Sequence, residues 1–145
     1  MHAMTNRVML ALAPVIALMI FISPRVQAQA PDAKLQRGKY LVEEVARCQE
    51  CHTPKTETGE FDKAKWMKGA KLEVAPIGTI QGWHAASPDL TATSALWQRW
   101  GQDGMTKFLE TARNPRGGKA GPPMPAYTMS HDDADAIVTF LKSLQ

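Results

Sequence analysis

The chain has few cysteines and little net charge, and each of these features excludes a class of protein. Two cysteines in 145 residues rule out a scaffold of several disulfides. A net charge of +3 leaves no basic stripe of the kind that binds nucleic acid, so we expect no nucleic-acid partner. Internal repeats and low-complexity tracts are also missing, and 44% of the residues are apolar. Length and composition therefore predict one globular domain.

The sequence also lacks an apolar run long enough to span a bilayer with confidence. Its longest run, Val8–Ile22, has 15 residues and is interrupted by Pro14, whereas a spanning helix needs about 20. Arg7 places a positive charge just before the run. This order of features is typical of a secretory signal peptide.

A cleavage site follows this run. Val26-Gln27-Ala28 has small or apolar residues at the two positions that signal peptidase reads. We therefore expect residues 1–28 to be a cleaved signal peptide and residues 29–145 to form a periplasmic domain. Cleavage lowers the formal charge by two, to +1, because two arginines leave with the leader. Cleavage after Ala30 and retention of the leader as an anchor are the alternatives.

The two cysteines occur in one five-residue motif, Cys48-Gln49-Glu50-Cys51-His52. C-x-x-C-H is the pattern of covalent c-type haem attachment. Residues three apart share a face of a helical turn, so both sulfurs can reach the two vinyl groups on one porphyrin edge. His52 then lies beneath the iron as the proximal ligand. We expect its other ring N–H to donate to a backbone carbonyl of the following loop, near Pro76.

Two other kinds of site also use a pair of cysteines at this spacing. A structural zinc site needs four ligands, and the other histidines of residues 29–145, His84 and His131, fit no zinc module in their spacing. A thioredoxin-like dithiol needs a surrounding strand-helix-strand pattern, whereas the flanking residues indicate helix and loop. Both alternatives are disfavoured.

The sixth iron ligand is predicted to be Met124, within Pro122-Pro123-Met124-Pro125. Prolines fix their own backbone angle and restrict the residue before them. A loop that is already ordered loses less entropy when a weak thioether ligand binds iron. The alternative is that Met124 only packs in its loop.

Other residues compete for that position. Met67, Met105 and Met129 lack a proline frame and are expected to be packing residues. His84 would give a bis-histidine haem but is more typical of a solvated loop residue. We expect His131 to face solvent at the start of the last helix.

Helical periodicity predicts an all-α fold with long loops. We expect a first helix over Asp32–Arg47, capped by Asp32, and a last helix with its apolar positions over Ala134–Leu144, capped by Ser130. Gly38 inside the first helix indicates close approach of the last helix, with Phe140 as a contact.

The middle of the chain is predicted to be less regular. A short apolar stretch over Ala95–Trp100 precedes a helix over Asp103–Arg113, which Asn114-Pro115 stops. Thr53–Thr93 is predicted to be a long loop that wraps the haem. Trp66 and Trp83 in this loop are candidates to contact the cofactor or a propionate, although ordinary packing is the simpler interpretation for each.

With these residues in view, the chain resembles the class I cytochrome c family over nearly the whole of residues 29–145. The resemblance is carried by Gly38-Lys39-Tyr40-Leu41, by Cys48-x-x-Cys51-His52-Thr53-Pro54, by the prolines around Met124 and by the last helix. It is closest to the small periplasmic monohaem cytochromes of bacterial respiratory chains. This resemblance implies an all-α fold with His52 and Met124 as axial ligands. The segment Lys55–Leu90 departs from the shortest family members by its length.

A haem with both axial positions filled has no vacancy for a substrate, so we expect electron transfer rather than catalysis. The predicted cofactor is one covalent haem c with its iron. The predicted partners are redox proteins: a dehydrogenase, an oxidase or another cytochrome. A haem-domain subunit of a larger oxidoreductase is the main alternative. A small peroxidase or gas-binding protein is a further one.

Overall fold

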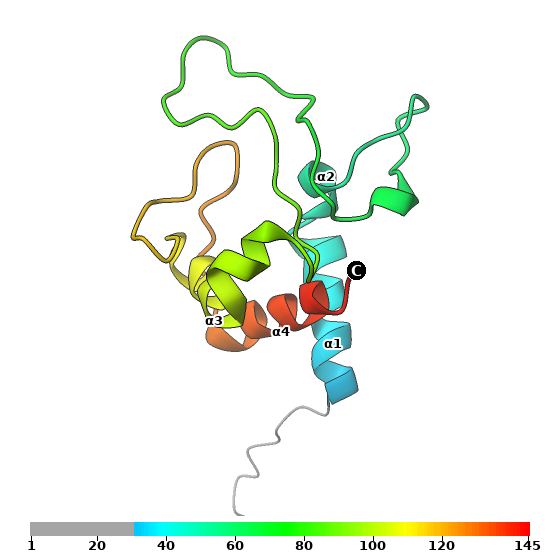
Figure 1. The fold of residues 1–145 in the computed structure, drawn as a ribbon, viewed down its shortest axis with the longest axis vertical. Helices are drawn as coiled ribbons and strands as arrows, with labels where there is room; N and C mark the ends of the chain where they lie inside the picture. Colours follow the sequence, from blue (N-terminus) through cyan, green and yellow to red (C-terminus); the bar gives the residue numbers. More distant parts are fainter. Residues whose placement is uncertain (1–30) are drawn as a thin grey trace, which may run out of the picture.

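The computed structural model describes residues 31–145. The predicted signal peptide and its cleavage site lie outside these residues. The described part is all-α, as predicted, and contains no β-strand beyond three isolated bridges. Its elements, shown in Figure 1, are α1 (Pro31–Tyr40), the π-helix η1 (Leu41–Val45), α2 (Gln49–His52), the 3₁₀ turn η2 (Lys63–Lys65), α3 (Ala95–Thr111) and α4 (His131–Lys142). Within residues 31–145, no helix is long and apolar enough to cross a membrane.

The first and last helices cross in close contact, as Gly38 predicted (Figure 1). A Cβ at Gly38 would lie 2.7 Å from the Ala136 carbonyl carbon and 2.9 Å from Phe140 Cβ. Only glycine therefore lets the two backbones approach this closely. The contact with Phe140 is as expected.

Charged side chains join the same two helices at their outer edge. Lys34 forms an ion pair with Asp135. Arg37 Nη2 and Nε donate to Asp133 Oδ1 at 2.9 and 3.0 Å. Because these groups are partly exposed, the pairs fix orientation more than they stabilise.

The bounds of the first helix differ from the prediction at both ends. It begins at Pro31, so Asp32 lies in its first turn and is not the cap. The helix continues as a π-helix to Val45, and Arg47 adopts a left-handed conformation with φ 50°. The predicted end at Arg47 was thus two residues too late.

The predicted apolar stretch and the predicted middle helix are joined in α3. Gly101 interrupts it with φ 62° and ψ −177°, between the predicted Ala95–Trp100 stretch and the predicted Asp103–Arg113 helix. The second half ends at Thr111, because Ala112 is left-handed, at φ 54°, and donates its N–H to Phe108. The helix therefore stops before the Asn114-Pro115 signal is reached.

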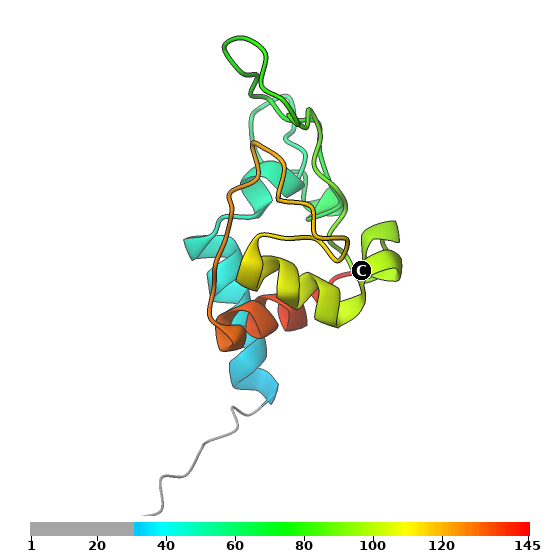
Figure 2. The ribbon, with the colours of Figure 1, turned by 90° about the vertical axis from the view of Figure 1, so that its left-hand side faces the viewer.

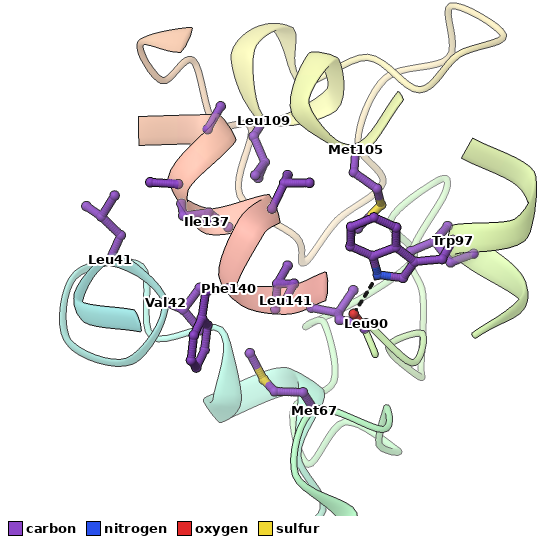
Figure 3. Close-up of a cluster of buried hydrophobic side chains, with 14 residues drawn as sticks. Leu41, Val42, Met67, Leu90, Trp97, Met105, Leu109, Ile137, Phe140 and Leu141 are labelled. Carbon is purple, nitrogen blue, oxygen red and sulfur yellow. Dashed lines mark hydrogen bonds between the residues drawn. The ribbon is translucent and has the colours of Figure 1, made fainter. Parts of the chain in front are cut away.

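The core lies where α1, η1, α3 and α4 meet (Figure 3). Val42, Ile137 and Val138 are at most 1% exposed. The Trp97 indole N–H donates to the Leu90 carbonyl oxygen at 2.8 Å, which joins the end of the long loop to α3. The helices thus form a packed base on which the loops rest.

The predicted loop Thr53–Thr93 is irregular, as expected, and is fastened to the haem-attachment motif. The Ser87 hydroxyl donates to the Cys51 carbonyl oxygen at 2.5 Å and accepts the Ala70 N–H at 2.9 Å. Gly69 N–H donates to the His52 carbonyl oxygen at 2.9 Å. Two distant parts of the loop are therefore held against the motif.

Candidate functional site

The motif forms a single helical turn after a sharp change in chain direction. The left-handed Arg47 ends the first helical segment, and Cys48 then stands at the N-cap of α2. Its carbonyl oxygen accepts the N–H of His52 at 2.9 Å and that of Cys51 at 3.2 Å. Both cysteines and His52 line one cavity. The turn therefore presents all three side chains to the same space.

His52 is buried at 4% exposure and has one ring nitrogen engaged. Its Nδ1 lies 2.8 Å from the Pro88 carbonyl oxygen. A backbone carbonyl of the following loop was predicted, but Pro76 was the wrong residue. Burial lowers the pKa of His52, while the Pro88 carbonyl acts in the opposite direction. A neutral ring with Nδ1–H donating to Pro88 leaves the Nε2 lone pair free to bind a metal.

Both thiols are free in this structure and half-buried. Burial, with a smaller contribution from the neighbouring Cys51, raises the pKa of Cys48 to about 11. A thiol of this kind stays protonated at neutral pH and is a poor nucleophile by itself. This disfavours a redox-active dithiol. Within residues 31–145, no three His, Cys, Asp or Glu side chains lie together as a metal-binding group.

Met124 lies on another part of the cavity wall, between Pro123 and Pro125. Its N–H closes a turn onto the Gly121 carbonyl oxygen at 3.1 Å. At the end of this loop, the Tyr127 hydroxyl donates to the Ala46 carbonyl oxygen at 3.2 Å, just before the motif. The loop is therefore joined to the same region that carries Cys48.

His84 is packed against the Met124 loop. A Cβ at Gly121 would lie 2.5 Å from His84 Cδ2 and 3.0 Å from the Gly82 carbonyl oxygen. The His84 N–H also donates to the Pro122 carbonyl oxygen at 2.8 Å. The residue is exposed but reaches the cavity wall. His84 thus supports the ligand loop from the side of the long loop.

The cavity has the size and lining that a haem requires. Its volume is about 560 Å³, within the roughly 300–1,000 Å³ of small-molecule sites. Figure 2 shows α2 above α3 and α4, with the loop before α4 running alongside them. The residues that line the cavity come from all of these segments. Much of the wall is aliphatic or aromatic, including Leu72, Leu90, Leu96, Phe108, Leu109, Ile137 and Leu141. Two thiols for covalent attachment, with a neutral imidazole and a thioether as iron ligands, are the groups that a c-type haem uses.

The other candidate ligands differ in whether they line this cavity. Met67 is fully buried in the core, as expected for a packing residue. Met129 packs against the core and does not line the cavity. Met105 is buried as well, but it does reach the cavity wall, so it is a second thioether there. His131 is exposed, as predicted.

Ordinary packing, the simpler interpretation for Trp66 and Trp83, agrees with the structure. Neither Trp66 nor Trp83 lines the cavity; Trp66 stacks edge-on against Phe61 at 5.7 Å, which is ordinary packing. Trp100 lines it instead, beside Arg99. Lys119 was also missed, because its position depends on how the loop after α3 folds back.

Comparisons with known proteins point in one direction. A model of the cytochrome c family matches residues 35–145. The cytochrome c subunit of a quinone alcohol dehydrogenase from Gluconobacter oxydans is 32% identical over 130 residues, covering 85% of this chain and 26% of the relative. The gluconate 2-dehydrogenase cytochrome c subunit of Pantoea cypripedii is 33% identical, covering 84% and 30%. The fructose dehydrogenase cytochrome subunit of Gluconobacter japonicus is 33% identical, covering 74% and 21%. The chain thus spans less than a third of the length of these relatives.

Proposed function

The chain belongs to the cytochrome c family, whose members bind haem c covalently, and we propose that it carries single electrons between redox proteins on one such haem. Cys48 and Cys51 form the thioethers, His52 is the proximal ligand and Met124 is the distal ligand. The count of one haem rests on the single C-x-x-C-H motif.

One observation carries the assignment. His52, at 4% exposure, has Nδ1 engaged by Pro88 and lines an apolar cavity together with both thiols and Met124. The bound haem supplies an iron that cycles between the ferrous and ferric states. The protein holds the ligands, excludes water from the ring and tunes the potential through its charges. With two protein ligands, no position is left open for a substrate.

A dehydrogenase is the proposed electron donor. This proposal rests on the printed roles of the relatives, which are cytochrome subunits of dehydrogenases. The chain would act either as a free carrier or as a subunit of such a complex. A place in a periplasmic respiratory chain follows if residues 1–28 direct export, as their sequence predicts.

The proposed function is tested by identifying the distal iron ligand. Met124→Ala should abolish the far-red sulfur-to-iron charge-transfer band of the oxidised protein and lower the reduction potential, because a thioether favours ferrous iron. Met129→Ala is the matched control, since Met129 does not line the cavity. Met105→Leu tests the other thioether on the wall.

Each result has a separate meaning. If only Met105→Leu removes the band, then Met105 is the ligand and the Met124 assignment is wrong. If neither methionine matters but His84→Ala changes the spectrum, the haem is bis-histidine. A pyridine haemochrome assay without covalent haem would overturn the proposed function as a whole.

A further inference from the structure

The cavity wall carries two full positive charges and, within residues 31–145, no carboxylate. Arg99 comes from the first half of α3 and Lys119 from the loop that follows α3. Neither forms an ion pair with a carboxylate of the described residues. Both side chains are exposed, so solvent partly screens their charges, but each reaches the wall of a mostly apolar cavity. These two cations are therefore available to an anionic ligand in the cavity.

The segments that carry the two cations pack against each other. Pro115, in the loop with Lys119, has its Cγ 3.0 Å from where a Cβ at Gly104 would lie. Trp100, the neighbour of Arg99, has its Cβ 3.1 Å from the same point. The loop and the first half of α3 thus meet beside Gly104 and form one side of the cavity.

An additional donor lies in the same place. Trp100 lines the cavity, and its indole N–H donates none of the hydrogen bonds found within residues 31–145. The contrast is Trp97, whose indole is satisfied by Leu90. A tryptophan at the edge of an apolar site usually gives its N–H to a polar partner.

We propose that Arg99 and Lys119 bind the two propionate carboxylates of the haem, with the Trp100 indole as a further donor. This inference rests on the proposed function, which places haem c in the cavity. Haem brings two carboxylates into a mostly apolar site. An arginine fork matches a carboxylate bidentately, whereas a lysine offers a compact charge. The propionate edge of the ring would then face Arg99 and Lys119.

The two cations also act on the iron. The ferric state carries one more positive charge than the ferrous state, so nearby cations disfavour it. Replacing either cation by a neutral residue should shift the ferrous–ferric equilibrium toward the ferric form. We expect a shift of about threefold to tenfold, or about 28 to 59 mV for a one-electron couple.

The experiment compares Arg99→Gln and Lys119→Gln with Arg116→Gln in the haem-loaded protein. Arg116 is an exposed arginine of the loop that carries Lys119, and it does not line the cavity. The Arg116→Gln variant therefore removes one positive charge away from the site. The measurements are redox potentiometry and the propionate-bending bands in resonance Raman spectra. We expect both cavity variants to lower the potential and move the bands, and Arg116→Gln to shift the equilibrium less than twofold.

A charge-conserving variant separates charge from packing. Arg99→Lys should recover most of the potential but not the bidentate Raman signature, because lysine keeps the charge and loses the fork. The proposal is overturned if Arg99→Gln and Lys119→Gln behave like Arg116→Gln while each protein retains its covalent haem. Loss of haem from the wild-type protein would instead refute the proposed function, so the two failures are distinguishable.

Discussion

The crossing of α1 and α4 and the loops around the cavity are held in place by different means. The crossing buries its own side chains, and Gly38 brings the two backbones together without help from a ligand. The loops over residues 53–93 and 112–130 contain little regular structure, and their inner surface forms part of the cavity wall. They are fastened by a few hydrogen bonds to the motif. The α1–α4 crossing therefore depends mainly on the chain itself, and the loops depend more on what fills the cavity.

Loss of the haem should break this comparison most strongly. Replacing both cysteines, Cys48→Ser with Cys51→Ser, removes the proposed attachment. Without the haem, the apolar lining of the cavity, including Leu96, Phe108 and Ile137, would lose its packing partner. We expect the loops over residues 53–93 and 112–130 to lose amide protection, and the α1–α4 crossing to lose less. Hydrogen exchange followed by mass spectrometry measures both regions in one sample.

Two results of the hydrogen-exchange experiment would contradict this prediction. Loops that stay protected without covalent haem would show that their own contacts suffice. Equal loss in loops and helices would show that the protein unfolds as one unit.

Gly38→Ala should damage the other region. The added Cβ meets Ala136 and Phe140, and overpacking of this kind costs about 1–3 kcal/mol or more. We expect a lower midpoint of denaturation by far-UV circular dichroism, with covalent haem content unchanged. Gln36→Ala, at an exposed position of α1, is the control and should leave the midpoint nearly the same. A wild-type midpoint in Gly38→Ala would refute the close crossing.

Ser87→Ala tests a single fastening of the long loop. The change removes a hydroxyl that bonds Cys51 and Ala70, at a cost of about 1–3 kcal/mol. Exchange at the Ala70 amide should accelerate. Ser143→Ala removes a hydroxyl that donates to Phe140 at 2.6 Å, at the end of α4. It should lower stability without affecting the Ala70 amide, and acceleration at Ala70 in both variants would contradict this separation.

The smallest expected effect concerns an exposed pair that links α3 to α4. His131 Nδ1 lies 2.6 Å from Glu110 Oε1. The bond to Glu110 raises the pKa of His131 above its usual 6.5, so this contribution to stability is present below 6.5 and is lost as pH rises through the raised value. The bonds to His131 and Lys107 lower the pKa of Glu110 below 4.5, so its contribution is lost as pH falls.

Replacing His131 by glutamine should therefore lower stability only in the pH range in which Glu110 is ionised and His131 is protonated. Denaturation of wild type and variant is compared below, between and above these two pH values. We expect the largest difference between them and little difference well above the pKa of His131. A difference that persists at alkaline pH would mean that the histidine acts by packing rather than by charge.

Helix positions were predictable where the signal is local. Ser130 accepts the Asp133 N–H and caps α4 as its sequence indicates, because a cap and its first turn are neighbours in the chain. The end of the first helix was not predictable. Its apolar spacing continues past Tyr40, yet the backbone widens into a π-helix and then reverses at Arg47, where it must deliver Cys48 to the cavity.

By itself, the sequence determined the attachment turn, since Cys48, Cys51 and His52 are contiguous and one helical turn puts them on the same cavity. It also determined that the first and last helices touch, since an interior glycine costs stability unless a neighbour needs the space. Only the tertiary structure decided that Pro88 rather than Pro76 accepts from His52. Only the tertiary structure places both Arg99 and Lys119 on the wall of the same cavity. Such pairings depend on the path of long loops, and that path is set by contacts between residues far apart in the chain.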